Sequence, residues 1–444
     1  MNTDLQIIHG DNREVLKGFA DNTFHAIVTD PPYELGFMGH RWDRSGIAYD
    51  PAVWSQCLRV LKPGGYLLSF GGSRTYHRMA CAIEDCDFEI RDMIEWLYGS
   101  GFPKSMDVSK AMDKKEGAKR EVVGHANYTV NDKRGGAYAS EEATQRDRLA
   151  VPITQPSTIN AQLWSGYGTA LKPAHEPICV ARKALDGTVV ENVLKWGCGA
   201  VNIDGSRIEC EPIRTSRNIA LGSSSGGIYS PADKPSQFVN HKDGRFPANL
   251  ILDSDAAALL DLQSGQNCGA AAPKRKGHSG ASKGIYQDFA SKGDDGKTFY
   301  GDAGGAARFF QRCDFTDEER ELNLQFALRF YYTAKASGTD RGNNTKAALP
   351  LFDVPEEVFR NSHPTVKPIA LMKYLLRLVV PGAGEPIKNS KLEMQNGSRP
   401  RVLDPFLGSG TTAVACRELG IDCTGIELQA EHMTIIHERL GLKV

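Results

Sequence analysis

Short apolar runs and amphipathic stripes alternate near both ends of the chain. Apolar residues at positions 53, 54, 57, 58 and 61 follow helical spacing, whereas Ala26 to Val28 form a continuous apolar run of the kind found in fully buried strands. This alternation predicts an α/β fold with a mostly parallel sheet and helices on both faces. The predicted strands are Leu5–Asp11, Thr23–Thr29, Tyr66–Phe70, Phe88–Leu97, Ala174–Lys183, Arg401–Leu403 and Asp422–Glu427. The predicted helices are Asn12–Phe19, Pro51–Leu61, Arg74–Asp85, Ile369–Val380, Thr411–Leu419 and Leu428–Leu440.

The middle of the chain lacks this regularity. Residues 105–155 are polar, and the stretch that follows residue 186 contains three glycine-rich segments with weak periodicity. Such composition is typical of loops and small irregular domains. We therefore expect five parts: a first core segment at 1–110, a mobile polar insertion at 111–155, core strands at 156–185, an irregular insert at 186–325 and a second core segment at 326–444.

Composition narrows the class of protein. The 444 residues are 41% hydrophobic and 24% charged, which is ordinary for a globular protein. No apolar run reaches about 18 residues and the N-terminus lacks a basic segment followed by an apolar one, so we expect neither a membrane span nor a signal peptide. The ten cysteines are scattered without a Cys-x-x-Cys pair, which favours free thiols in a reducing cytoplasm and argues against a metal site.

Charge is distributed unevenly although the net charge is only −1. Residues 104–134 contain eight basic and five acidic side chains, and residues 268–312 contain eight basic and four acidic ones. Either stretch alone is explained by a solvated polar loop, but two of them, taken together with the motif described in the next paragraph, predict a surface that contacts phosphates. The candidate DNA-binding residues are Lys104, Lys114, Lys115, Lys274, Arg275 and Lys276.

The segment Asp30-Pro31-Pro32-Tyr33 directly follows the predicted strand Thr23–Thr29. A carboxylate, a carbonyl fixed by proline and an aromatic ring in one tight turn suit an exocyclic amino group on a flat heterocycle, since two acceptors take its two hydrogens while the ring stacks on the base. The structural alternative is a proline turn that caps a strand and buries the tyrosine. On the chemical interpretation, all four residues are catalytic candidates.

A glycine-rich segment follows the predicted strand Arg401–Leu403. Gly408-x-Gly410-x-x-Ala413, with Glu427 on the next strand, matches a loose dinucleotide fingerprint, so a dehydrogenase is an alternative for this element alone. An acidic strand end, however, suits a ligand that carries a cationic amino group and would repel a pyrophosphate, which favours S-adenosylmethionine. No lysine follows Gly410, which argues against a nucleoside-triphosphate loop. The cofactor candidates here are Asp404, Phe406, Gly408, Ser409, Gly410, Thr411 and Glu427.

Two further segments supply cofactor candidates. In His363–Pro368, the Thr365 hydroxyl and the Lys367 ammonium lie between prolines and could clamp the carboxylate of a methionine moiety; the alternative is a rigid helix start. Asp11, at the end of the first predicted strand, could accept a hydrogen bond from an adenine amine of the cofactor, and a helix N-cap is an equally good and compatible interpretation.

The order of these motifs resembles the β-group of DNA amino-methyltransferases, which modify N6 of adenine or N4 of cytosine. In that group the Asp-Pro-Pro-Tyr segment comes first, a target-recognition region follows and the Phe-x-Gly-x-Gly segment comes last. The resemblance covers roughly residues 5–110, 160–185 and 326–444. Ser100–Lys104 and Leu171–Pro177 also resemble segments of phage and prophage members, which implies a bacterial, phage or prophage origin.

The resemblance implies a Rossmann-like S-adenosylmethionine-dependent methyltransferase fold with a mostly parallel seven-stranded sheet, permuted motif order and target recognition by the irregular insert. It implies methylation of a flipped base in double-stranded DNA without a metal. Adenine N6 is the preferred target, because Asp rather than Ser stands at position 30. Cytosine N4, an RNA base, a protein amide, and a DNA-binding protein with an unused site are alternatives. A homodimer and a cognate restriction endonuclease stay open as further partners.

A cytosine-C5 methyltransferase is the nearest competing class. Glu191-Asn192-Val193 imitates one of its motifs. That chemistry needs a cysteine nucleophile after a proline, and none of the ten cysteines follows a proline. We therefore interpret Glu191 as incidental.

Overall fold

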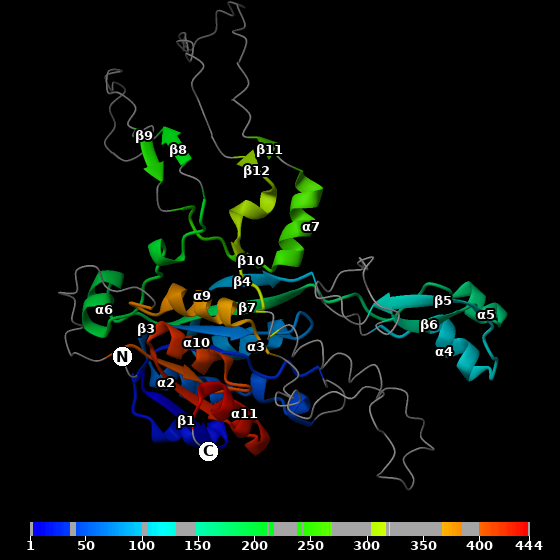
Figure 1. The fold of residues 1–444 in the computed structure, drawn as a ribbon. Helices are drawn as coiled ribbons and strands as arrows, with labels where there is room; N and C mark the ends of the chain where they lie inside the picture. Colours follow the sequence, from blue (N-terminus) through cyan, green and yellow to red (C-terminus); the bar gives the residue numbers. More distant parts are fainter. Residues whose placement is uncertain are drawn as a thin grey trace, which may run out of the picture. The chain divides into compact units, whose positions relative to one another are not determined.

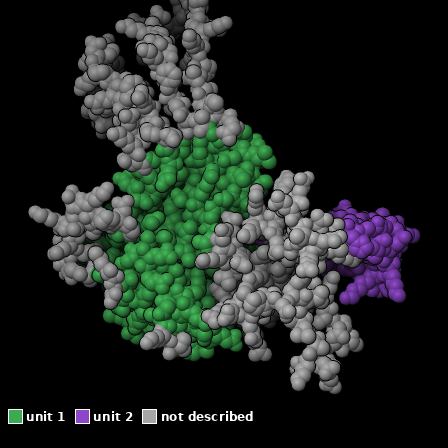
Figure 2. Space-filling view, viewed as in Figure 1, with its two compact units in different colours: residues 1–96, 176–444 green, residues 97–175 purple. Residues whose placement is uncertain are grey.

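The computed structural model describes residues 3–35, 41–99, 105–129, 148–210, 213–216, 238–241, 244–265, 267–268, 303–316, 319, 366–383 and 399–442. The chain divides into two compact units, residues 1–96 with 176–444 and residues 97–175 (Figure 2). The first unit contains the central sheet. Among the described residues, no helix combines the length and apolar character needed to cross a membrane.

Nine strands form the central sheet, in the order β1-β15-β14-β2-β3-β7-β4-β10-β13 (Figure 1). Strand β14 pairs in parallel with β15 and with β2, so the first and last parts of the chain share one sheet. Strand β7 differs in direction, since it runs antiparallel to β3. The strands of this sheet are β1 (Leu5–His9), β2 (Phe24–Thr29), β3 (Leu61–Phe70), β4 (Phe88–Leu97), β7 (His175–Lys183), β10 (Leu250–Leu252), β13 (Gln311–Arg312), β14 (Arg401–Asp404) and β15 (Asp422–Glu427).

Helices cover the sheet on both faces. Strand β14 connects through a helix to β15 on one side, and β2 connects through a helix to β3 on the other, so right-handed crossovers place these helices on opposite faces. All six residues of β2 are buried accordingly. The helices of the first unit are α1 (Asn12–Val15), α2 (Pro51–Val60), α3 (Tyr76–Glu84), α6 (Val189–Trp196), α7 (Ser254–Ser264), α9 (Ile369–Val379), α10 (Thr411–Leu419) and α11 (Ala430–Leu440).

Local sequence signals fix several helix ends. Asp50 caps α2 by accepting a hydrogen bond from the Ala52 amide at 2.9 Å, and Pro51 occupies the first turn, where its missing N–H costs nothing. Helix α10 begins after Gly410 and ends at Gly420, both with positive φ. The predicted helix Thr411–Leu419 and the predicted strand Asp422–Glu427 are confirmed to the residue.

Two sequence-based expectations for the fold are wrong in detail. The sheet has nine strands instead of seven, because β10 and β13 extend it beyond β4. Both come from the insert at 186–325, which is therefore not irregular throughout: it also contains α6 and α7. Small two-stranded sheets in the same region pair β8 (Ile213–Ser216) with β9 (Phe238–His241) and β11 (Asn267–Cys268) with β12 (Ala303–Gly304).

The second unit is built from a hairpin and two helices. Strands β5 (Val122–Thr129) and β6 (Arg148–Thr154) pair antiparallel, and α4 (Val108–Lys115) packs against α5 (Ile159–Leu163). Buried Asp113 holds these parts together, since it pairs with Arg120 at 3.2 Å and accepts the Thr158 amide at 2.9 Å. The predicted insertion at 111–155 lies inside this unit.

The central strands of the first unit generate a stability prediction. Leu67 on β3 is fully buried, so Leu67→Ala should lower the free energy of unfolding by about 2–5 kcal/mol through lost transfer energy and a cavity. Leu262→Ala on α7, where the side chain is 82% exposed, is the matched control and should change it little. Urea denaturation measures both, and equal effects would contradict the assigned core.

Candidate active site

The two sequence motifs meet where β14 and β2 lie side by side. The chain leaves these neighbouring strands in opposite directions, which makes the crevice at their carboxyl ends the expected ligand site of an open α/β sheet. Thr29, the last residue of β2, donates its hydroxyl to Asp404 Oδ1 at 2.6 Å, and Asp404 is the last residue of β14. The loops that follow β2 and β14 therefore begin side by side at the same end of the sheet.

A partly buried cluster of four side chains, in which Lys367 is the most buried, contains two residues of the first motif. Lys367 Nζ lies 2.6 Å from Asp30 Oδ2 and 3.2 Å from Glu176 Oε2. The Tyr33 hydroxyl donates to the same Glu176 oxygen at 2.8 Å. Lys367 also lies 5.2 Å from the centre of the Tyr33 ring and 5.0 Å from that of Phe70, which adds cation–π attraction.

Asp30 keeps one oxygen open. Its Oδ1 atom is buried and accepts no hydrogen bond from the residues that the structure describes. Leaving such an acceptor unsatisfied costs about 1–3 kcal/mol, so a buried exception of this kind calls for an explanation, of which a functional role is one. The carboxylate is thus fixed through Oδ2 and able to accept a donor through Oδ1.

Burial and the neighbouring charges both change the pKa values of Asp30 and Lys367. Burial raises the pKa of Asp30, the Lys367 ammonium lowers it and the Glu176 carboxylate raises it, with a net rise. Burial lowers the pKa of Lys367, but Asp30 and Glu176 raise it more, so the lysine stays protonated at neutral pH.

The second motif forms a loop over the end of β15. Gly408 donates its amide to Glu427 Oε2 at 2.8 Å, and Phe406 donates its amide to Asp404 Oδ1 at 3.0 Å. Gly408 and Gly410 both adopt positive φ, and a Cβ on Gly410 would lie 3.2 Å from Ile436. Only glycine suits this backbone without strain.

Two predicted cofactor residues have other partners. Arg439 donates from Nη1 to the Ser409 hydroxyl at 2.9 Å and to the Thr411 hydroxyl at 3.0 Å. Both side chains are buried against this arginine of α11. Their hydroxyls thus help to anchor the loop, and a direct role in holding a cofactor stays a prediction.

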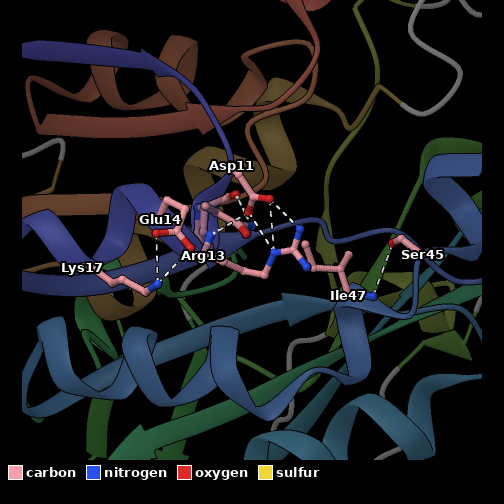
Figure 3. Close-up of polar contacts among 8 residues, drawn as sticks. Asp11, Arg13, Glu14, Lys17, Ser45 and Ile47 are labelled. Carbon is pink, nitrogen blue, oxygen red and sulfur yellow. Dashed lines mark hydrogen bonds and ion pairs between the residues drawn. The ribbon is translucent and has the colours of Figure 1, made fainter.

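Asp11 serves as the N-cap of α1, one of its two predicted roles. It accepts the Arg13 amide at 2.9 Å and forms an ion pair with the Arg13 guanidinium (Figure 3). In the same exposed group, Lys17 pairs with Glu14 at 2.8 Å (Figure 3). The next residue, Asn12, donates to the Pro405 carbonyl at 3.0 Å while its Oδ1 stays buried without a partner among the described residues.

The remaining predicted residues separate into three groups. Lys367 lies against Asp30, and its predicted contact with the carboxylate of a cofactor stays a prediction. Lys114 and Lys115 are exposed in the last turn of α4. Outside the described residues are Lys104, Lys274, Arg275, Lys276 and Thr365.

Sequence reasoning missed Glu176, Asn12 and Thr29. Glu176 stands in a segment that resembles the family, which was the available signal, but only the antiparallel direction of β7 shows that it reaches the site. Glu191 forms a capping box with Thr188 at the start of α6, which gives it a structural role, and its interpretation as incidental to catalysis stays a prediction.

The residues at this edge fit S-adenosylmethionine. Asp404 receives hydrogen bonds from Thr29 and Phe406, both at Oδ1, and the negative charge of its carboxylate suits a cationic amine. Glu427 accepts three hydrogen bonds, from Gly408, Gln429 and His432, which leaves about one of its four acceptor positions for a ribose hydroxyl. Among the described residues, no group of His, Cys, Asp and Glu could hold a metal ion.

The environment of Asp404 predicts a pH effect. Burial raises the pKa of this carboxyl to about 6, from an ordinary value of 3.8. The folded protein therefore binds the proton more tightly, and Asp404 destabilises it progressively as the pH rises from about 4 to 6. Asp404→Asn keeps an acceptor for Thr29 and removes the charge. We expect the free energy of unfolding of Asp404→Asn, minus that of the unaltered protein, to rise by about 1–3 kcal/mol between about pH 4 and pH 6 in denaturation experiments. A difference that does not change with pH would show that the pKa of Asp404 is not raised in the folded protein.

Curated relatives match part of this sequence. Type II methyltransferase M.SmaI of Serratia marcescens is 32% identical over 122 residues, which are 26% of this chain and 36% of that protein. M.HpaI of Haemophilus parainfluenzae is 28% identical over 116 residues, 25% of this chain and 37% of that protein. The chain thus matches about a third of the length of these curated relatives.

Solved structures that match the chain weakly include the cytosine-N4-specific PvuII DNA methyltransferase and the complex of M1.HpyAVI with SAM. The first has 11% identity and a TM-score of 0.39, covering 99% of this chain and 87% of that one. The second has 14% identity and a TM-score of 0.35, covering 99% and 100%. The family model for N6 and N4 DNA methylases matches residues 24–195 and 313–438, which is more than half of the chain. The chain therefore belongs to the N6/N4 DNA methylase family.

Proposed function

We propose that the chain transfers a methyl group from S-adenosylmethionine to the exocyclic N6 amine of adenine in duplex DNA, after flipping the base out of the helix. One observation carries this proposal: Asp30, held by Lys367 through Oδ2, keeps a buried Oδ1 that accepts no hydrogen bond from the described residues, and the ring of Tyr33 lies against the same Lys367. The acid at position 30, rather than a serine, supports adenine over cytosine N4.

The side chains of the first motif would position the amine. Asp30 Oδ1 and the Pro31 carbonyl would accept its two hydrogens and thereby turn the nitrogen lone pair out of conjugation with the ring. Tyr33 would stack on the extruded base, whose unstacking costs roughly a few kcal/mol. Positioning and electrostatic stabilisation then supply the catalysis, without a covalent intermediate on the protein.

The second motif would hold the cofactor. Asp404 suits its amino group, Glu427 its ribose hydroxyls, and the backbone of Gly408 and Gly410 allows close approach. S-adenosylmethionine held by these residues would supply the methyl group, and the bonding pair of its carbon–sulfur bond would stay on sulfur. The amine nitrogen gains positive charge in this reaction, and Asp30 Oδ1 stabilises that charge and accepts the surplus proton. The raised pKa of Asp30 suits it to this role as a base.

Removing the proposed acceptor tests the mechanism. Asp30→Ala should lower kcat by at least about 10²–10³-fold, because the transition-state charge loses its partner. The affinity for S-adenosylmethionine, measured by calorimetry, should stay nearly unchanged, since the cofactor contacts lie on the second motif. Turnover like that of the unaltered chain would remove Asp30 from the mechanism.

The product identifies the target. Duplex DNA is incubated with isotopically labelled S-adenosylmethionine and the nucleosides are analysed by mass spectrometry. Labelled N6-methyldeoxyadenosine supports the proposal, and labelled N4-methyldeoxycytidine would show that the target is cytosine instead. Nucleosides without label would refute DNA methylation by this chain.

The basic end of α4 gives a prediction on DNA binding. Replacing both Lys114 and Lys115 by alanine should reduce the slope of log affinity against log salt by up to about 2, because each phosphate contact contributes about 0.9. Lys195→Ala is the control, since this exposed lysine is already paired with Asp186 at 2.6 Å. Fluorescence anisotropy on duplex DNA measures the slopes, and equal slopes for all proteins would exclude α4 from the interface.

A further inference from the structure

Glu176 is the member of the partly buried cluster that none of the sequence motifs contains. It stands near the start of β7, whose Ile178 pairs with Phe70 at the end of β3. Because β7 runs antiparallel to β3, its beginning lies at the edge where the parallel strands end. The Gly71 amide, which donates to the Pro177 carbonyl at 2.9 Å, fixes the backbone beside Glu176 at that edge.

One oxygen of Glu176 serves two groups. Its Oε2 atom accepts the Tyr33 hydroxyl at 2.8 Å and lies 3.2 Å from Lys367 Nζ. The backbone of Tyr33 is also fixed, because the Thr75 hydroxyl donates to its carbonyl at 2.7 Å. The ring proposed to stack on the base is therefore held at both ends, by Thr75 at its backbone and by Glu176 at its hydroxyl.

The cluster has an excess of negative charge. Asp30 and Glu176 share the single ammonium of Lys367, so the three groups carry a net charge of −1 when ionised. The titratable groups with an electrostatic effect on Asp30 are Lys367, Glu176 and Tyr33, and Asp404 interacts with it from the end of β14. The ammonium is divided between two carboxylates, so it neutralises neither completely.

We propose that Glu176 is a positioning residue for methyl transfer: it orients Tyr33 and draws the Lys367 ammonium partly away from Asp30, which leaves Asp30 Oδ1 a strong acceptor. This inference rests on the proposed function. The proposal gives a residue of β7 a role in catalysis, although β7 lies outside both sequence motifs. The excess negative charge is complementary to the positive charge that develops on the amine nitrogen.

Neutralising Glu176 has a definite electrostatic consequence. In Glu176→Gln, the side chain can still accept the Tyr33 hydroxyl, but Lys367 is left with Asp30 as its only carboxylate partner in the cluster. This substitution removes the Glu176 carboxylate, which raises the pKa of Asp30, and keeps the Lys367 ammonium, which lowers it. The pKa of Asp30 should therefore fall. If activity requires ionised Asp30, the acidic limb of the kcat–pH profile must move to lower pH.

The test compares Glu176→Gln with the unaltered full-length chain on duplex DNA. We expect kcat to fall by about 10–100-fold, as is typical when a residue that supports a reacting group is changed. The affinity for S-adenosylmethionine should be unchanged, and the acidic limb should move to lower pH. NMR titration of ¹³C-labelled aspartate carboxyls in the unliganded protein, with Asp30→Asn to assign the signal, should show the same shift.

Two further variants separate charge from structure. Glu176→Asp retains the charge on a shorter side chain, so the acidic limb should stay near its original pH even if kcat falls. Glu89→Gln on β4 is the matched control, since Glu89 binds buried Arg182 of β7 outside the site. It should leave both kcat and the profile unchanged.

The outcomes are distinguishable. Unchanged kcat and an unchanged limb in Glu176→Gln overturn the inference, and so does a loss of kcat with an unmoved limb, which is what a structural defect alone produces. If Glu176→Gln does not fold, a displaced acidic limb in Glu176→Asp overturns it. Failure of the unaltered chain to methylate DNA would instead refute the proposed function itself.

Discussion

The ion pair between Lys367 and Asp30 is the interaction on which the rest of the site depends. It joins a loop near the beginning of the chain to a segment near its end, with the two charged atoms 2.6 Å apart. A buried ammonium is costly unless carboxylates surround it, so its burial requires Asp30 and Glu176 to stay close. Lys367 contacts Asp30 through Oδ2 and also lies near Glu176. The ion pair that offsets the cost of burying Lys367 therefore leaves the other oxygen of Asp30, Oδ1, without a partner among the described residues.

Strand direction determines which residues can join this contact. Parallel strands β14 and β2 bring the ends of both motifs to one edge, where Thr29 and Asp404 are hydrogen-bonded. A parallel neighbour of β3 would contribute its last residues to that edge. Strand β7 is antiparallel and contributes its first residues, which is why Glu176 reaches Tyr33 and Lys367. The site thus combines the carboxyl ends of two strands with the amino end of a third.

Much of this arrangement could be predicted from the sequence, because periodicity and capping signals are local. They located α10 and β15 to the residue and placed both motifs directly after strands. The contacts of Lys367 could not be predicted, since its partner lies 337 positions away and depends on the whole sheet. Strands β10 and β13 were missed because three and two residues are too few to show a period.

The two ends of the second unit are hydrogen-bonded to each other. Tyr98 donates its amide to the Ala174 carbonyl at 3.0 Å, and the flanking strands β4 and β7 are neighbours in the sheet. Closing a segment between points that are already adjacent depends only weakly on the length of that segment. Residues 97–175 can therefore be lengthened, trimmed or exchanged in evolution while β2, β7 and β14 keep their places in the sheet.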